Sequence, residues 1–224
     1  MNKARDEVLQ RIRTALRDVP VDETPAVVER GYQQTSTATQ PELIAQFAKR
    51  VAEYKVRVQQ VTPDELLGAI SAACAARGVR TLVVPADGCS TILPAGWAPA
   101  GVELLRDQGL THAQLDQSDG VLTGCALAIA QTGTIVLDCG VGQGRRAITL
   151  LPDYHLCVVR ADQIVDLVAE AVARLDPLTQ RAEGTAENRR PLTWISGPSA
   201  TSDIELNRVE GVHGPRTLDV LIVV

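Results

Sequence analysis

Aromatic side chains make up only 3% of this 224-residue chain, and one phenylalanine is present. The core therefore has to be built from Ala, Val, Leu and Ile, which suits a parallel sheet covered by alanine-rich helices. Lysine is also scarce, with 3 residues against 19 scattered arginines, a bias that we attribute to coding preference rather than function. The net charge of -5 argues against nucleic acid as the main partner.

Long apolar runs are missing as well. No stretch reaches the length of a membrane span, so no span is predicted. The first residues carry charges of both signs and no apolar core, which is unlike a secretory signal. We expect a cytoplasmic protein.

The spacings that bind metals are absent too. The five cysteines are odd in number and none are at CxxC spacing: Cys74, Cys89, Cys125, Cys139 and Cys157. Three histidines lie far apart. This pattern predicts buried free thiols, and neither a metal site nor an intrinsic iron–sulfur cluster.

The chain divides into residues 1–40 and residues 41–224. Residues 1–17 have the apolar spacing of an amphipathic helix, and the polar, proline-containing stretch up to residue 40 has the composition of a linker. A short terminal helix cannot form its own core. It must dock onto the larger domain, onto a second copy in a homo-oligomer, or onto a partner, and the first is the simplest arrangement.

The larger region alternates strand-like and helix-like segments, which predicts an α/β domain with a mostly parallel sheet. The predicted strands are residues 55–61, 79–85, 102–105, 134–137, 155–159, 193–196 and 218–224. The predicted helices are residues 41–53, 62–77, 125–130 and 162–175.

The richest stretch in turn-forming and polar residues lies near the C-terminus. Gly197 opens a turn with Pro198, and the hydroxyls of Ser199 and Ser202 could satisfy the freed N–H groups or hold an anion. Ser202 to Glu205 resembles a helix start, which is itself an anion site. A purely structural turn and cap is the alternative.

Two further segments could bind an anion. Arg145 and Arg146 follow a glycine run whose Gly-x-Gly-x-Gly spacing is not a dinucleotide fingerprint, and they could clamp a carboxylate or phosphate. The turn Thr132-Gly133-Thr134 could form a nest of N–H groups. The alternatives are solvated arginines and a plain turn.

Candidates for acid–base catalysis are His213, Asp203 and Glu205. His213 stands in the segment that continues through Gly214 to Arg216, and a loop histidine that only bonds backbone is equally common. Asp203 and Glu205 are two residues apart, so in a helix only one of them would face a pocket.

Three blocks of the sequence resemble the lactate utilization protein C family, the LUD-domain proteins. They are residues 128–137, residues 150–159 and the C-terminal block from residue 196, in the family's order over roughly residues 40–224. The chain departs from the family at Gln131, where an acidic residue is usual, and near Cys125, where another is frequent.

The resemblance implies a Rossmann-like fold of the NagB/RpiA/CoA-transferase type. It also implies a subunit of a bacterial system that oxidises L-lactate to pyruvate, with iron–sulfur clusters on partner proteins. The subunit would bind a small carboxylate or organise those partners, and whether it is itself an enzyme stays open. The rivals are a stand-alone enzyme acting on a phosphorylated or CoA-linked molecule, by fold analogy alone, and a scaffold with a vestigial pocket.

We expect the candidate ligand residues to meet in one cleft at the carboxyl ends of the strands, where open α/β sheets bind ligands. These residues are Thr132, Gly133, Thr134, Arg145, Arg146, Gly197, Ser199, Ser202, Gly214 and Arg216.

Overall fold

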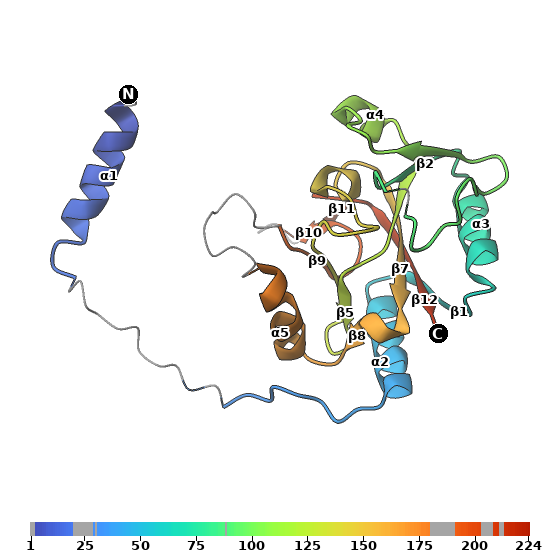
Figure 1. The fold of residues 1–224 in the computed structure, drawn as a ribbon, viewed down its shortest axis with the longest axis horizontal. Coiled ribbons are helices and arrows are strands. Elements are labelled where there is room, and N and C mark those ends of the chain that lie inside the picture. The colour runs from blue at the N-terminus through green and yellow to red at the C-terminus, as the bar shows by residue number, and fades with distance from the viewer. Residues whose placement is uncertain are drawn as a thin grey trace. The chain divides into compact units, whose positions relative to one another are not determined.

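The computed structural model describes residues 3–19, 29, 31–87, 89–179, 191–202, 208–210 and 213–224. The chain forms two compact units, Met1–Tyr32 and Gln33–Val224. The smaller unit contains helix α1 (Lys3–Ala15; Figure 1). This helix buries none of its residues, and its apolar residues Val8 and Ile12 are exposed, as is Leu16 just after its end.

The boundary between the units falls eight residues before the one expected from composition. The backbone N–H of Ser36 donates to Glu170 at 2.8 Å, and the Ser36 hydroxyl donates to Asp166. These contacts explain why residues 33–39, despite their linker composition, belong to the larger unit.

The larger unit is built on a six-stranded sheet whose neighbouring strands are all parallel, in the order β1-β12-β7-β4-β2-β3. The strands are β1 (Arg57–Val61), β2 (Thr81–Val84), β3 (Glu103–Arg106), β4 (Gly120–Thr123), β7 (Tyr154–Arg160) and β12 (Thr217–Val223). His155 on β7 is in register with Val121 on β4 and with Leu218 on β12. The α/β fold with a mostly parallel sheet is therefore confirmed.

A second, four-stranded sheet has the order β8-β5-β6-β9. Its strands are β5 (Leu127–Ile129), β6 (Thr134–Leu137), β8 (Ile164–Val165) and β9 (Thr193–Ile195). The helix predicted for residues 125–130 is wrong, because Leu127–Ile129 pair antiparallel with β6. Alanine has the highest helix propensity, but propensity is a weak determinant of conformation, and here the complete burial of Ala128 and Ala130 overrides it.

Two of the predicted helices begin later than their sequence signals suggest, at Leu66 and at Val168. The described helices of the larger unit are α2 (Gln40–Glu53), α3 (Leu66–Arg77), α4 (His112–Asp116) and α5 (Val168–Thr179), with 3-10 turns η1 (Arg146–Thr149) and η2 (Ala161–Gln163). Glu65 accepts hydrogen bonds from the N–H and hydroxyl of Thr62, as a capping box requires, but the α-helix proper starts one turn later. The segment predicted as one helix from residue 162 instead contains η2 and β8 before α5 begins.

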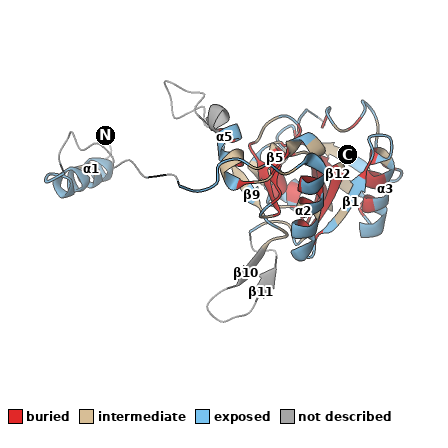
Figure 2. Ribbon diagram, turned by 90° about the horizontal axis from the view of Figure 1, so that it is seen from below, coloured by how far each residue is buried: buried red, intermediate tan, exposed pale blue. Residues whose placement is uncertain are grey.

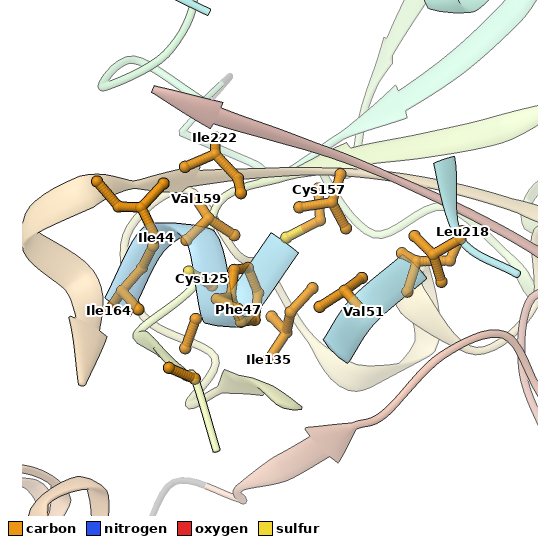
Figure 3. Packing of buried hydrophobic residues seen from close by; sticks show 14 of the residues in the cluster. Ile44, Phe47, Val51, Cys125, Ile135, Cys157, Val159, Ile164, Leu218 and Ile222 are labelled. Carbon is orange, nitrogen blue, oxygen red and sulfur yellow. The ribbon is translucent and has the colours of Figure 1, made fainter. Parts of the chain in front are cut away.

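Both faces of the large sheet are covered. Helix α3 packs on one face through a cluster that includes Ile70, Leu82 and Leu156. On the other face, Phe47 of α2 is completely buried against residues of both sheets, including Ile135 and Val159 (Figures 2 and 3). The single phenylalanine thus joins α2 to both sheets.

Candidate functional site

A pocket of about 270 Å³ lies beside the amino ends of β7 and β12, and we call it the amino-edge pocket. His155 and Leu218, the second residues of these two strands, line it. The full lining is Arg146, Thr149, His155, Thr193, Trp194, Ile195, Ser196, Gly197, Pro198, Ser199, His213, Gly214, Pro215 and Leu218. The expected location at the carboxyl ends is therefore wrong for Arg146 and for the segment around His213, because these precede β7 and β12. Gly197 and Ser199, in contrast, do follow the carboxyl end of a strand, β9 of the second sheet.

Arg146 is the cation of the amino-edge pocket. Its Nη1 donates to the carbonyl oxygen of Thr149 at 3.0 Å and to the Thr149 hydroxyl at 3.1 Å. Within the described part of the chain, no carboxylate lies within ion-pair distance of this guanidinium. Burial lowers the pKa of Arg146, as expected for a half-buried cation without a paired anion.

Arg145 does not join the pocket. Its Nε and Nη2 donate to the two carboxylate oxygens of Asp107 at 2.7 and 2.9 Å, and Nη2 also donates to the carbonyl oxygen of Leu110. The Asp107 side chain is 4% exposed, and the hydrogen bonds from Arg145 lower its pKa. This arginine fixes the loop before α4, so of the two neighbouring arginines only Arg146 faces the pocket.

His155 forms part of the pocket wall, and sequence reasoning missed it as a site residue. The residue is 1% exposed, and its Nε2 lies 2.7 Å from the hydroxyl of Thr123 on β4. Burial, followed by the nearby charge of Arg146, lowers the pKa of His155 to about 4. The ring is therefore neutral at pH 7. A lone histidine within the apolar run of β7 was the signal that could have identified it.

Two segments of the lining, around Ser199 and around His213, are 14 residues apart in sequence and are hydrogen-bonded to each other. The N–H of Ser199 donates to the carbonyl oxygen of Pro215 at 2.8 Å, and the N–H of His213 donates to the Ser199 hydroxyl at 3.0 Å. Gly197 has φ +98°, and a Cβ there would lie 2.6 Å from Cβ of Tyr54 at the end of α2. Glycine is thus required where this segment crosses the helix.

The predicted nest at Thr132-Gly133-Thr134 is the turn that joins β5 and β6, and none of the three residues lines the pocket. Thr134 is one bond away, because its hydroxyl lies 2.7 Å from that of Ser196, a lining residue, and Thr132 bonds Thr134 in turn. Gly133 has φ +63° and approaches the backbone of Arg50 in α2. The turn therefore packs on α2.

The remaining candidates lie elsewhere. Ser202 is the last residue of β10 (Ala200–Ser202), which pairs antiparallel with β11 (Arg208–Glu210). The helix predicted to start at Ser202 would occupy residues outside those that the structure describes. Asp203 and Glu205 lie outside the described residues. Arg216 is exposed and is 3.6 Å from the carboxylate of Asp153.

A second cavity of about 440 Å³ lies at the carboxyl edge of the large sheet, beside Val158 and Val223. It is larger, but the charged side chain and the amide side chain in its lining, Arg160 and Gln163, are already engaged. Arg160 pairs with Asp162 through two hydrogen bonds, and the Gln163 amide donates to the carbonyl oxygen of Cys125. None of the predicted ligand residues lines this cavity, so the amino-edge pocket is the stronger candidate.

The glycine run after β6 holds itself in place. Asp138 accepts hydrogen bonds from the N–H of Gly140 and the amide of Gln143, and Asp87 accepts one from the N–H of Gly142 at 2.6 Å. Because carboxylates of the chain occupy these donors, the loop is not set up as an anion cradle.

Among the described residues, no three His, Cys, Asp or Glu side chains gather as a metal site would require. No described helix combines the length and hydrophobicity needed to cross a bilayer.

Comparison with known proteins defines the family. The LUD domain model matches residues 44–223, nearly all of the larger unit, and the chain belongs to the LUD domain family. The chain is 47% identical to lactate utilization protein C of Deinococcus radiodurans, covering 86% of this chain and 84% of that protein. It is 30% identical to lactate utilization protein C of Geobacillus thermodenitrificans, covering 73% and 71%.

A crystal structure of a DUF162 family protein from Deinococcus radiodurans resembles the fold, with a TM-score of 0.67 and 41% identity. The similarity covers 84% of this chain and 99% of that one. Both the family resemblance and the α/β fold expected from the sequence are thereby confirmed.

Proposed function

We propose that this chain serves lactate utilization by binding a small carboxylate in the amino-edge pocket. The similarity to proteins named lactate utilization protein C supports the process. The observation that supports the ligand class is the guanidinium of Arg146, which faces the pocket without a carboxylate partner among the described residues. A guanidinium recognises a carboxylate by two parallel hydrogen bonds, and two of its three nitrogens make no hydrogen bond in the described structure.

The rest of the lining suits a ligand of this size. The hydroxyls of Thr149, Ser196 and Ser199 border the cavity, and Leu218 and Trp194 contribute apolar surface for a short carbon chain. About 270 Å³ accommodates a three-carbon acid together with water, whereas a whole coenzyme A would exceed it. A phosphorylated ligand remains the rival, because a phosphate also matches an arginine.

Isothermal titration calorimetry with L-lactate, pyruvate and glucose 6-phosphate tests this proposal. We expect one site for the three-carbon acids, and Arg146→Gln to weaken it by at least tenfold. Arg57→Gln is the matched control, because Arg57 is an exposed arginine on the edge strand β1. Tighter binding of glucose 6-phosphate than of either acid would favour the rival.

Genetics tests the process. Deleting the gene should impair growth on L-lactate and spare growth on glucose, and the Arg57→Gln variant should restore growth where Arg146→Gln does not. Normal growth of the deletion strain on L-lactate, with no second copy of the gene present, would remove the proposal.

We further propose that iron–sulfur clusters on partner subunits accept the electrons released when lactate is oxidised, as the family resemblance implies. Co-expression with the candidate partners should yield a complex in which the clusters' visible absorption co-elutes with this chain. Separate elution at concentrations typical of the cell would argue against a stable complex.

A further inference from the structure

The hydrogen bond between Thr123 and His155 determines what the amino-edge pocket offers to a ligand. Thr123 is completely buried, and its hydroxyl lies 2.7 Å from Nε2 of His155. Within the described part of the chain, this is the only hydrogen bond of the Thr123 side chain. The hydroxyl proton therefore has one available acceptor, the lone pair on Nε2.

The direction of this bond fixes the tautomer of the ring. If Nε2 carried the proton, it would donate to Thr123 and leave a buried hydroxyl proton unpaired, which is unfavourable. If Thr123 donates, Nε2 is unprotonated and the proton of the neutral ring is on Nδ1. The low pKa of His155 supports a ring that carries only one proton. The second arrangement satisfies both groups.

Nδ1 opens onto the pocket. Every fully enclosed side-chain nitrogen and oxygen of the described residues has a hydrogen-bond partner, and Nδ1 of His155 has none among them. This atom is therefore not enclosed, although the residue as a whole is 1% exposed, and the cavity that His155 lines is the amino-edge pocket. The pocket thus has a second fixed donor, Nδ1–H, on the wall that also carries Arg146.

We propose that the amino-edge pocket binds 2-oxo carboxylates in preference to 2-hydroxy carboxylates, with Arg146 on the carboxylate and Nδ1–H of His155 on the adjacent ketone oxygen. A ketone oxygen only accepts hydrogen bonds, as the carboxylate does, so both groups match a pair of donors. A hydroxyl at the same carbon brings a proton of its own, which needs a further acceptor. This inference rests on the proposed carboxylate binding and assigns the pocket to the oxidised acid.

Calorimetry with pyruvate, L-lactate and propionate at pH 7 tests the preference, since propionate has the carboxylate but no oxygen at the second carbon. We expect pyruvate to bind about tenfold more tightly than L-lactate, the usual effect of one unmatched polar group. No binding of any of the three acids would overturn the proposed function itself. Binding in which L-lactate equals or exceeds pyruvate would overturn only the preference.

Two variants separate the roles of the ring nitrogens. His155→Asn places an amide near the position of Nδ1 and should keep the preference, whereas His155→Gln places it near Nε2 and should abolish it. If both variants kept the preference for pyruvate, that result would contradict the assignment of the donor to Nδ1–H. Nitrogen NMR of the imidazole rings reads the tautomer without any ligand: a protonated Nδ1 on His155 supports the proposal, and a protonated Nε2 overturns it.

Discussion

Lowering the pH from 7 to 5 should destabilise this protein through a single side chain, His155. Its pKa falls from the ordinary 6.5 to about 4 because the ring is buried and lies near Arg146. Between these two pKa values, His155 binds a proton in the unfolded chain but stays neutral in the folded state, so protonation favours unfolding. The stabilisation is complete above pH 6.5 and is lost as the pH falls toward 4.

The magnitude follows from the two pKa values. Integrating the difference in bound protons between pH 7 and pH 5 gives a loss of about 2 kcal/mol in the free energy of unfolding, and about 3 kcal/mol once the pH is below 4. The paired carboxylates of Asp107 and Asp162 have lowered pKa values, so their contributions are lost only at lower pH. The interval from pH 7 to pH 5 thus reports mainly on the histidine.

Urea unfolding at pH 7, 6 and 5 measures the effect, with the midpoint falling at constant slope. The control is His155→Gln, which can keep a hydrogen bond to Thr123 and has no titrating group. Its stability should change little between pH 7 and pH 5. A wild-type curve that is flat over this interval, or a variant that loses as much stability as the wild type, would refute the burial argument.

Four further outcomes are expected. Arg145→Ala should lower the free energy of unfolding by about 2 kcal/mol, because it leaves the enclosed carboxylate of Asp107 unpaired. The same variant should bind pyruvate as the wild type does in calorimetry, and weakened binding with intact stability would contradict this. Phe47→Ala should lower the free energy of unfolding in urea by about 3 to 5 kcal/mol, since it leaves a cavity among the buried residues that surround Phe47. A loss below 1 kcal/mol would be inconsistent with that packing. Gly133→Ala should lower the melting temperature by several degrees, because a Cβ at φ +63° would lie 2.9 Å from the backbone of α2, whereas Gly31→Ala, at a position with nothing within 4 Å of the added Cβ, serves as control. The chain purified alone under anaerobic conditions should contain no iron, zinc or flavin, and stoichiometric iron with a visible absorption band would refute this expectation from the cysteine spacing.

The elements that the sequence predicts well are those in which local pattern and tertiary environment agree. Residues 82–84 and 156–159 are continuous apolar runs within two of the predicted strands, and both are buried in the parallel sheet. Residues 125–130 show the opposite case, where small apolar residues favour a helix locally. In the structure Ala128 and Ala130 pack in the cluster around Phe47, so long-range packing decides their conformation.

The site was predictable in part. Arg146, Gly197, Ser199, His213 and Gly214 do meet in one pocket, as the polar and turn-forming blocks indicate. The position of the pocket was not predictable from the rule that open α/β sheets bind ligands at the carboxyl ends of their strands. The order of residues along the chain holds the better clue, because the last of these blocks comes immediately before the final strand and so must lie at its amino end.

The difference between Arg145 and Arg146 shows why sequence alone could not assign the ligand residue. The two are adjacent and chemically identical, and what separates them is Asp107, 38 residues earlier in the chain. Asp107 neutralises one guanidinium, and no described carboxylate neutralises the other. A half-buried cation without an anion is unfavourable in the ligand-free protein, as the lowered pKa of Arg146 indicates. An anionic ligand would relieve that penalty on binding, so the unpaired charge favours the bound state without requiring any other contact to strengthen.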